Sequence, residues 1–176
     1  KNRLLSGLVV TAFGTTKIEN CIVDVDFTST HDNLYGYIGG FVANVSGEIS
    51  IKNSLYIGSI TCPADSYMGG LAGDINTSYY YSNSKLSAEN VLIYIEDGTN
   101  APNLNTLTAR TTYTKNVFYV NEHNDGLHGA IKVSSEDVLS GKVAWLLNNG
   151  NSEGLWRQTL GTDLYPNFTG SIVYPV

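Results

Sequence analysis

A unit of sequence recurs along the first two thirds of the chain, and one copy of it occupies residues 37–57, YIGGFVANVSGEISIKNSLYI. Its Gly-Phe-Val part returns as Gly7-Leu8-Val9, Gly40-Phe41-Val42 and Gly70-Leu71-Ala72, whose glycines are 33 and 30 residues apart. Its second Asn lies in a set of similar segments, with steps of 33, 30 and 33 residues, at Asn20, Asn53, Asn83 and Asn116. Two landmarks with matching steps predict an internal repeat.

Between these landmarks the sequence consists of short runs rich in β-branched residues, which are broken by Gly, Asn-Asp and Ser-Gly turns. No amphipathic helix fits between residues 5 and 98. Such a period without a helix predicts an all-β fold, a short parallel β-helix or β-solenoid of about four coils in residues 1–130. Strand twist and the crossover rule favour a right-handed winding. The fourth coil has Asn103 in place of the Gly, so the repeat weakens toward the C-terminus.

The recurrent residues receive structural roles in such a fold. Asparagines stacked about 4.8 Å apart could exchange hydrogen bonds from coil to coil. The glycines would lie where the backbone has a positive φ or where a neighbouring wall approaches closely. We therefore predict a structural ladder made of Asn20, Asn53, Asn83, Asn116, Gly7, Gly40 and Gly70.

The pattern changes at Ile131, and residues 131–176 are predicted to form a capping segment. Ser134 or Ser135 can N-cap one helix, which Asn149-Gly150 would end, and its apolar face would consist of Leu139, Val143, Leu146 and Leu147. A Trp-rich loop and a short strand at residues 172–174 follow. Laid over the open end of the solenoid, this segment would cover unpaired strands and apolar core. Its aromatic residues Trp145, Trp156, Tyr165 and Phe168 are expected to pack there, in preference to forming a sugar platform.

Residues 37–42 (YIGGFV) and 67–73 (YMGGLAG) resemble GLUG repeats, a motif of secreted and cell-surface bacterial proteins that include IgA-specific metallopeptidases and large adhesin-like proteins of gut bacteria. Gly70-Leu71-Ala72-Gly73 matches the Gly-Leu-x-Gly core, whereas the copies at Gly7 and Gly40 lack the last Gly. The resemblance covers residues 5–121. Residues 156–166, WRQTLGTDLYP, are similar to a C-terminal segment that follows such repeats in surface proteins of gut bacteria. The resemblance implies an extracellular or cell-surface module without catalytic residues.

Composition and charge exclude two classes of partner. The formal net charge is −6 and only 15% of the residues are charged, so no basic stripe could follow the phosphates of a nucleic acid. No apolar run approaches the roughly 18 residues that a membrane-spanning helix needs. The start at Lys1, without an initiator Met or a signal peptide, indicates a processed or excised piece of a longer protein with other domains.

Catalytic and metal-binding patterns are weak. Parallel β-helices include polysaccharide lyases and hydrolases, and Asp24 and Asp26, two apart on a strand pattern, are the carboxylates that could share one face. The loop that contains His123 and His128 gives no fixed common face for a metal, so no metal site and no cofactor are predicted. Cys21 and Cys62 lie in no Cys-x-x-Cys motif and are expected to be free thiols, with a disulfide as the alternative.

Tyrosines are the stronger signal for binding, since the chain has 12 of them. Tyr79, Tyr80 and Tyr81, together with Tyr35, Tyr37, Tyr56 and Tyr67, could line a face that holds a sugar or a protein partner. The residues predicted to bind a ligand are Tyr79, Tyr80, Tyr81, Asp24 and Asp26. The alternative is that these rings fill the coils and cover turns. The sequence thus favours a non-catalytic surface or secreted module, adhesin-like or a spacer, whose partner would be a host protein or glycan. A glycan-binding module and a polysaccharide lyase or glycoside hydrolase are the alternatives.

Overall fold

The computed structural model describes residues 3–29, 36–62, 66–76, 78, 83–96, 101–108, 110, 112–124 and 127–171. Strands predominate in this part of the chain, and they pair in parallel in three sheets. The prediction of a mostly β fold with parallel strands is confirmed.

The first sheet, sheet A, has the spatial order β1 (Arg3–Ser6), β5 (Gly36–Gly39), β8 (Tyr67–Gly69), β11 (Leu104–Asn105). Sheet B has the order β13 (Ile131–Lys132), β12 (Tyr113–Val120), β10 (Lys85–Ile95), β6 (Val42–Gly58), β2 (Val9–Glu19), and β3 (Ile22–Asp24) and β9 (Ala72–Ile75) also pair with β6. Sheet C consists of β4 (Phe27–Thr28) and β7 (Ile60–Thr61).

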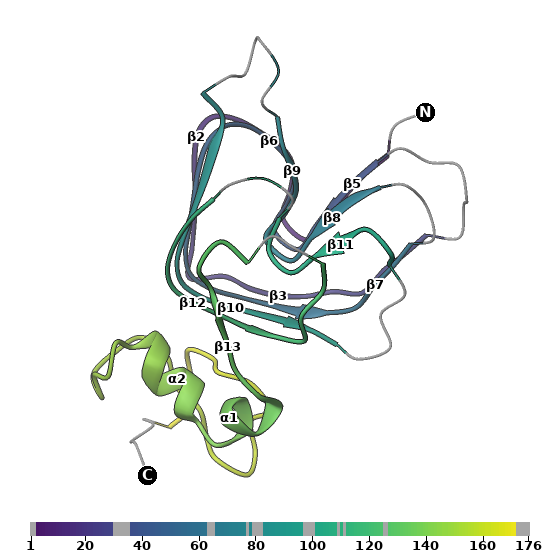
Figure 1. The fold of residues 1–176 in the computed structure, drawn as a ribbon. Helices are drawn as coiled ribbons and strands as arrows, with labels where there is room; N and C mark the ends of the chain where they lie inside the picture. The colour runs from purple at the N-terminus through teal and green to yellow at the C-terminus, as the bar shows by residue number, and fades with distance from the viewer. Residues whose placement is uncertain are drawn as a thin grey trace.

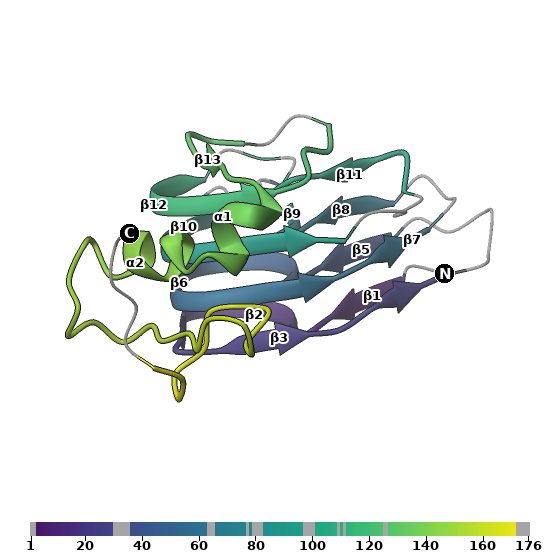
Figure 2. The ribbon, with the colours of Figure 1, turned by 90° about the horizontal axis from the view of Figure 1, so that it is seen from below.

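The chain runs through sheet A and then sheet B several times in succession. We call each such run a passage, and each passage lies beside the previous one (Figures 1 and 2). At the end of sheet A the Gly7 backbone N donates to Gly40 O at 3.1 Å, Gly40 N donates to Gly69 O at 3.1 Å, and Gly70 N donates to Thr106 O at 3.2 Å. Figure 2 shows the resulting layers, from β1, β2 and β3 at one end to β11, β12 and β13 at the other.

Two apolar clusters lie on opposite faces of sheet B. Val23, Tyr56, Ile93 and Tyr119 are in register on β3, β6, β10 and β12, and they point into the main core between the sheets. Their neighbours along each strand point the other way because side chains alternate in a strand. On β6, β10 and β12 these neighbours begin a second cluster, the outer core, whose strand residues are Leu55, Ile57, Leu92, Phe118 and Val120.

The C-terminal segment forms two short helices, α1 (Ser135–Leu139) and α2 (Lys142–Leu147), so the prediction of a single helix is wrong. Ser134 is the N-cap of α1, and its hydroxyl accepts from the Asp137 backbone N while the Asp137 carboxylate accepts from Ser134 N. The chain turns at Gly141, which has φ 80°, a left-handed conformation that ends one helix and starts the next.

The helices lie against the side of sheet B rather than over the end of the stack of passages, as Figure 2 shows. The C-terminal segment completes the outer core with Val133, Val138, Val143, Ala144, Leu147 and Trp156. Leu127 and Ala130, which precede β13, pack instead against the main core. The prediction that residues 131–176 cap the open end is therefore wrong. The described residues of this segment instead cover the outer face of sheet B, and we call them the lateral cover. The short strand predicted at residues 172–174 lies outside the described residues.

Candidate functional site

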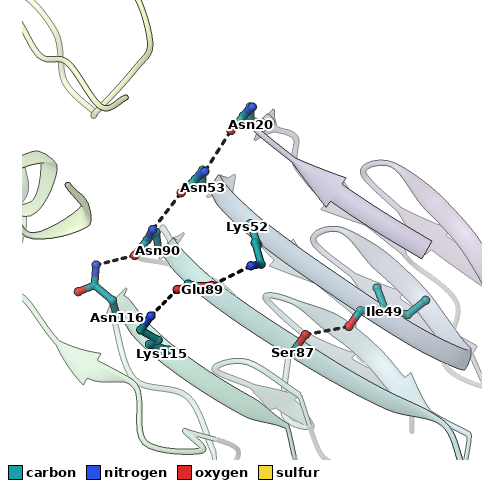
Figure 3. Close-up of polar contacts among 9 residues, drawn as sticks. All are labelled: Asn20, Ile49, Lys52, Asn53, Ser87, Glu89, Asn90, Lys115 and Asn116. Carbon is teal, nitrogen blue, oxygen red and sulfur yellow. Dashed lines mark hydrogen bonds and ion pairs between the residues drawn. The ribbon is translucent and has the colours of Figure 1, made fainter. Parts of the chain in front are cut away.

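A column of four asparagines marks one corner of the stack, and Figure 3 shows its side chains aligned along the layers. Asn53 Nδ2 donates to Asn20 Oδ1 at 3.3 Å, Asn90 Nδ2 donates to Asn53 Oδ1 at 3.0 Å, and Asn116 Nδ2 donates to Asn90 Oδ1 at 2.8 Å. All four residues have φ between 46° and 58°. Asn tolerates this left-handed region better than most residues, so the column satisfies a backbone requirement and a hydrogen-bonding requirement together.

Asn83 does not belong to this column, and its assignment to the ladder is corrected to Asn90. Asn83 is an exposed turn residue before β10. In the first two passages the column Asn follows the column Gly by 13 residues (20 − 7 and 53 − 40), whereas in the third it follows by 20 (90 − 70). The seven additional residues lie between β9 and β10.

The Gly column holds Gly7, Gly40 and Gly70, and the side chains of facing strands explain it. A Cβ at Gly7 would stand 2.3 Å from Val23 Cγ1, one at Gly40 would stand 2.7 Å from Tyr56 Cγ, and one at Gly70 would stand 2.4 Å from Ile93 Cγ2. Close approach of the opposite wall therefore excludes a side chain here, and none of these glycines has a positive φ. In the fourth passage Thr106 holds this place, and its hydroxyl donates to His123 O at 3.0 Å.

Asp24 and Asp26 have different surroundings. Asp24 ends β3 and is exposed, and its charge adds to the effect of burial in raising the pKa of Tyr165. Asp26 Oδ1 accepts hydrogen bonds from Ser59 N at 2.7 Å and from Ser59 Oγ at 2.8 Å, which hold the pKa of Asp26 below its ordinary value. The second carboxylate thus fixes the turn after β6.

The tyrosines named from the sequence divide into three groups. Tyr35, Tyr79, Tyr80 and Tyr81 lie outside the described residues. Tyr56 is fully buried in the main core, and its hydroxyl donates to Val25 O at 3.3 Å. Tyr37 and Tyr67 are in register on β5 and β8, and their ring centroids are 5.8 Å apart with a 39° angle between the ring planes.

Tyr37 and Tyr67 belong to the outer surface of sheet A. Ile38 and Met68, the next residues on the two strands, are fully buried in the main core, so the alternation of the strands directs both tyrosines away from it. The Tyr67 side chain is 44% exposed. Tyr37 is half-buried, so the two rings form a partly accessible aromatic pair in consecutive layers of sheet A.

A polar pair lies next to Tyr37. Arg110 Nε donates to Asp74 Oδ1 at 3.1 Å, with the Asp74 side chain only 8% exposed and the Arg110 side chain 46% exposed. Asp74 follows Gly73, where an added Cβ would stand 2.7 Å from the backbone N of Ile38, so β9 touches β5 beside Tyr37. Burial, and then the negative charge of Asp74, raise the pKa of Tyr37.

Asn44 adds a fifth side chain, since it is in register with Asp74 on the adjacent strand β6. Its Nδ2 donates to Ser46 Oγ at 3.2 Å, while its buried Oδ1 has no hydrogen-bond partner in the described part of the chain. We name Tyr37, Tyr67, Asp74, Arg110 and Asn44 the sheet A corner. Sequence reasoning named its two tyrosines but missed its polar residues, because their strands are separated along the chain.

His128 makes structural contacts, and the two cysteines are not bonded to each other. His128 Nε2 lies 3.0 Å from Thr108 O, and its carbonyl accepts from the Thr114 hydroxyl, which ties the segment before β13 to the last layer. Cys21 and Cys62 are free thiols, as expected. Among the described residues no group of three or more His, Cys, Asp or Glu side chains is placed to hold a metal ion.

The aromatic residues of the C-terminal segment pack on the side of sheet B. Trp156 is buried in the outer core with its ring centroid 4.7 Å from that of Phe168, and Tyr165 packs edge-on against Tyr94 at 5.0 Å. Trp145 is half-buried on α2. Trp156, Tyr165 and Phe168 hold the helices and the loop after them against sheet B.

Comparisons with known proteins add no relative: a scan of protein-family models and searches of curated proteins and of solved structures found no significant match to this chain. Neither α1 nor α2, the helices of the described part of the chain, has the length or apolar character to cross a membrane.

Proposed function

We propose that the repeated passages of residues 3–121 are the coils of a short right-handed β-solenoid of the GLUG type, and that this module is displayed by a secreted or cell-surface bacterial protein. Its role would be that of a non-catalytic spacer or adhesin-like module whose partner is a host protein or glycan. The observation that carries the proposal is the continuous Asn column from Asn20 to Asn116, which joins four successive layers by side-chain hydrogen bonds.

Such a column favours a rigid scaffold. Each layer adds about 4.8 Å and repeats the same backbone path, so side chains on the outer faces keep fixed spacings along the stack. Solenoids of this kind present extended surfaces to partners. Glu89 supports the same interpretation, since its carboxylate bridges Lys52 at 2.9 Å and Lys115 at 2.6 Å across three layers (Figure 3).

A screen for enzyme activity tests the non-catalytic part of the proposal. The wild-type protein is incubated with plant and host polysaccharides, and released reducing ends and unsaturated products are measured. We expect neither product. Release of either product, together with its loss in an Asp24→Asn, Asp26→Asn double variant, would favour a lyase or hydrolase instead.

Display at the surface is tested on the bacterium that produces the protein. Antibodies raised against residues 1–176 should label intact cells or detect the module in the culture medium, and protease added to intact cells should remove the cell-bound signal. Labelling only after the cells are opened would contradict the proposal.

Glycan binding is the second candidate function, and the Tyr37–Tyr67 pair is the observation that favours it. Two partly accessible rings 5.8 Å apart beside a fixed Asp–Arg pair are a combination of apolar platform and convergent polar groups. A spacer has no need of such a cluster.

A further inference from the structure

We infer that the sheet A corner is a binding site for an uncharged oligosaccharide, with the sugar rings lying over Tyr37 and Tyr67. The inference rests on the non-catalytic module proposed above and specifies the ligand class and residues of its glycan-binding form. Four observations support it: the partly accessible pair of rings, the polar side chains of Asp74, Arg110 and Asn44 beside it, which we call the polar wall, the charge of the cluster, and the placement of the two rings in adjacent layers.

The ring pair supplies an apolar platform that the fold itself does not require. The core positions of β5 and β8 are filled by Ile38 and Met68, while Tyr67 keeps 44% of its surface exposed. Tyr is amphipathic, so its ring face can stack on the apolar face of a sugar while its hydroxyl remains hydrated or bonds to the ligand. An exposed Tyr67 ring beside the half-buried Tyr37 ring in the next layer is better explained by a ligand than by packing.

The polar wall offers donors and acceptors in fixed positions. Arg110 uses Nε for Asp74, and its two Nη groups have no partner within the described residues. Asn44 Oδ1 is a buried acceptor without a partner in the same part of the chain. Sugar hydroxyls both donate and accept hydrogen bonds, so they match a wall that presents guanidinium donors beside a carboxylate acceptor.

Charge selects the uncharged class. Arg110 is neutralised by Asp74 within the cluster, and the chain as a whole carries a formal charge of −6. An anionic polysaccharide would approach a negative protein and meet no unpaired cation in the corner. A neutral chain has no such barrier.

The two rings follow each other along the stack because Tyr37 and Tyr67 are in register on adjacent strands. A ligand that contacts both rings must therefore extend across two layers. We expect an oligosaccharide, with longer chains binding more tightly than the monosaccharide.

Titration calorimetry and pull-down with insoluble polysaccharides test the inference on the full chain. The probes are the hexasaccharides of cellulose, xylan, mannan, chitin and starch, with heparin and polygalacturonate as anionic probes. We expect at least one neutral probe to bind, and we expect Tyr67→Ala and Arg110→Gln each to weaken that binding at least tenfold. Tyr113→Ala is the matched control, since Tyr113 is 65% exposed on β12 of sheet B and is not a corner residue, so its loss should change binding less than twofold.

Circular dichroism and thermal unfolding establish that each variant is folded, and both substituted side chains are exposed enough for this to be expected. The inference is overturned if no neutral probe binds, if only anionic probes bind, or if Tyr67→Ala and Tyr113→Ala lose affinity equally. None of these results would contradict the proposed role as a spacer. Conversely, release of products in the polysaccharide screen would contradict the proposed function even if Tyr67→Ala abolished binding.

Discussion

At the scale of single residues, Asn53 combines two demands that few side chains meet together. Its φ of 46° lies in the left-handed region, and its amide both donates to Asn20 Oδ1 and accepts from Asn90 Nδ2. We predict that Asn53→Leu lowers the free energy of unfolding by about 1 to 3 kcal/mol, because neighbouring amides lose partners and the backbone is strained. Urea unfolding followed by circular dichroism measures this change.

Two control variants separate the contributions. Asn53→Gly keeps the left-handed backbone accessible and removes only the amide, so it should cost less than Asn53→Leu. Asn83→Leu should change stability by less than about 0.5 kcal/mol, since Asn83 is an exposed turn residue outside the column. An equal loss at positions 53 and 83 would contradict the assignment of the column.

Asp26 gives a prediction about acid stability. Hydrogen bonds from Ser59 N and Oγ hold its pKa in the folded protein below the ordinary value of 3.8. A lowered folded-state pKa means that the stabilisation is complete above pH 3.8 and is lost as the pH falls through the folded-state value. Asp26→Asn should therefore show a flatter decline of unfolding temperature between pH 5 and pH 2 than the wild type. Asp24→Asn, which removes an exposed carboxylate that makes no bond to Ser59, is the control, and an equal flattening there would contradict the role of Ser59.

At the scale of the elements, the repeat could be predicted from the sequence where its spacing is regular. The steps between Gly7, Gly40 and Gly70 predicted which passages lie side by side, and the hydrogen bonds between them follow that order. The Asn column could be predicted for Asn20, Asn53 and Asn116 but not for Asn90. The third passage has seven additional residues before its column Asn, whereas the fourth has only 10 residues from Thr106 to Asn116 (116 − 106). The longer and the shorter spacing partly cancel, so the distance from Asn53 to Asn116 gives no sign that Asn90 is the column residue.

The helical spacing of apolar residues also led to a wrong prediction, a single C-terminal helix where the structure has two. The apolar spacing from Leu139 to Leu147 fits one helix, but Gly141 adopts φ 80° and redirects the chain. Two short helices follow the twisted outer face of sheet B, where Val138 and Val143 both reach the outer core. Tertiary packing, which the sequence pattern does not contain, decided between a costly Gly inside a helix and a break at that Gly.

Asn148 is the residue that holds the segment after α2 to the end of that helix. Its Nδ2 donates to Trp156 O at 2.8 Å and its Oδ1 accepts from Trp156 N at 2.8 Å, all within a buried region. We predict that Asn148→Ala lowers the free energy of unfolding by about 2 to 4 kcal/mol, because a buried N–H and a buried C=O lose their partners. Hydrogen exchange should speed up first at residues 148–158.

Asn151→Ala is the matched control for that variant. Asn151 is exposed, and its Oδ1 accepts only from Glu153 N within the described residues, so its loss should cost less than about 1 kcal/mol. If both variants unfold alike, the two bonds to Trp156 do not anchor the segment.

At the scale of the whole molecule, one signal for the lateral cover was present in the sequence. Residues 91–95 and 117–120 are continuous apolar runs, VLIYI and VFYV, whereas residues 21–25, CIVDV, are interrupted by the charged Asp24. Continuous apolar runs are typical of strands buried on both faces, whereas strands with one solvent-exposed face include polar residues. The sheet A corner carried no such signal, because Tyr37, Asp74 and Arg110 meet only through the stacking of separate passages.

The outer core leads to the last prediction, which concerns removal of the C-terminal segment. A chain that ends at Ser134 would expose the outward residues of sheet B, among them Leu55, Leu92 and Phe118, in consecutive layers. A contiguous apolar face of this kind drives association in water. We expect size-exclusion chromatography with light scattering to show oligomers or loss of soluble protein, where the full chain elutes at lower mass.

Replacing the three exposed residues decides where that association arises. In the shortened chain, Leu55→Thr, Leu92→Thr and Phe118→Thr keep strand-compatible side chains while making the outer face polar, and they leave the inward residues of the main core unchanged. If the lateral face is responsible, the triple variant should return to the elution volume of a compact, folded chain. Association that persists in the triple variant would instead place the contact at the unpaired edges of the end strands, which is the role first expected of an end cap. A shortened chain that stays soluble and compact without any substitution would mean that covering the outer core does little to prevent self-association of this protein.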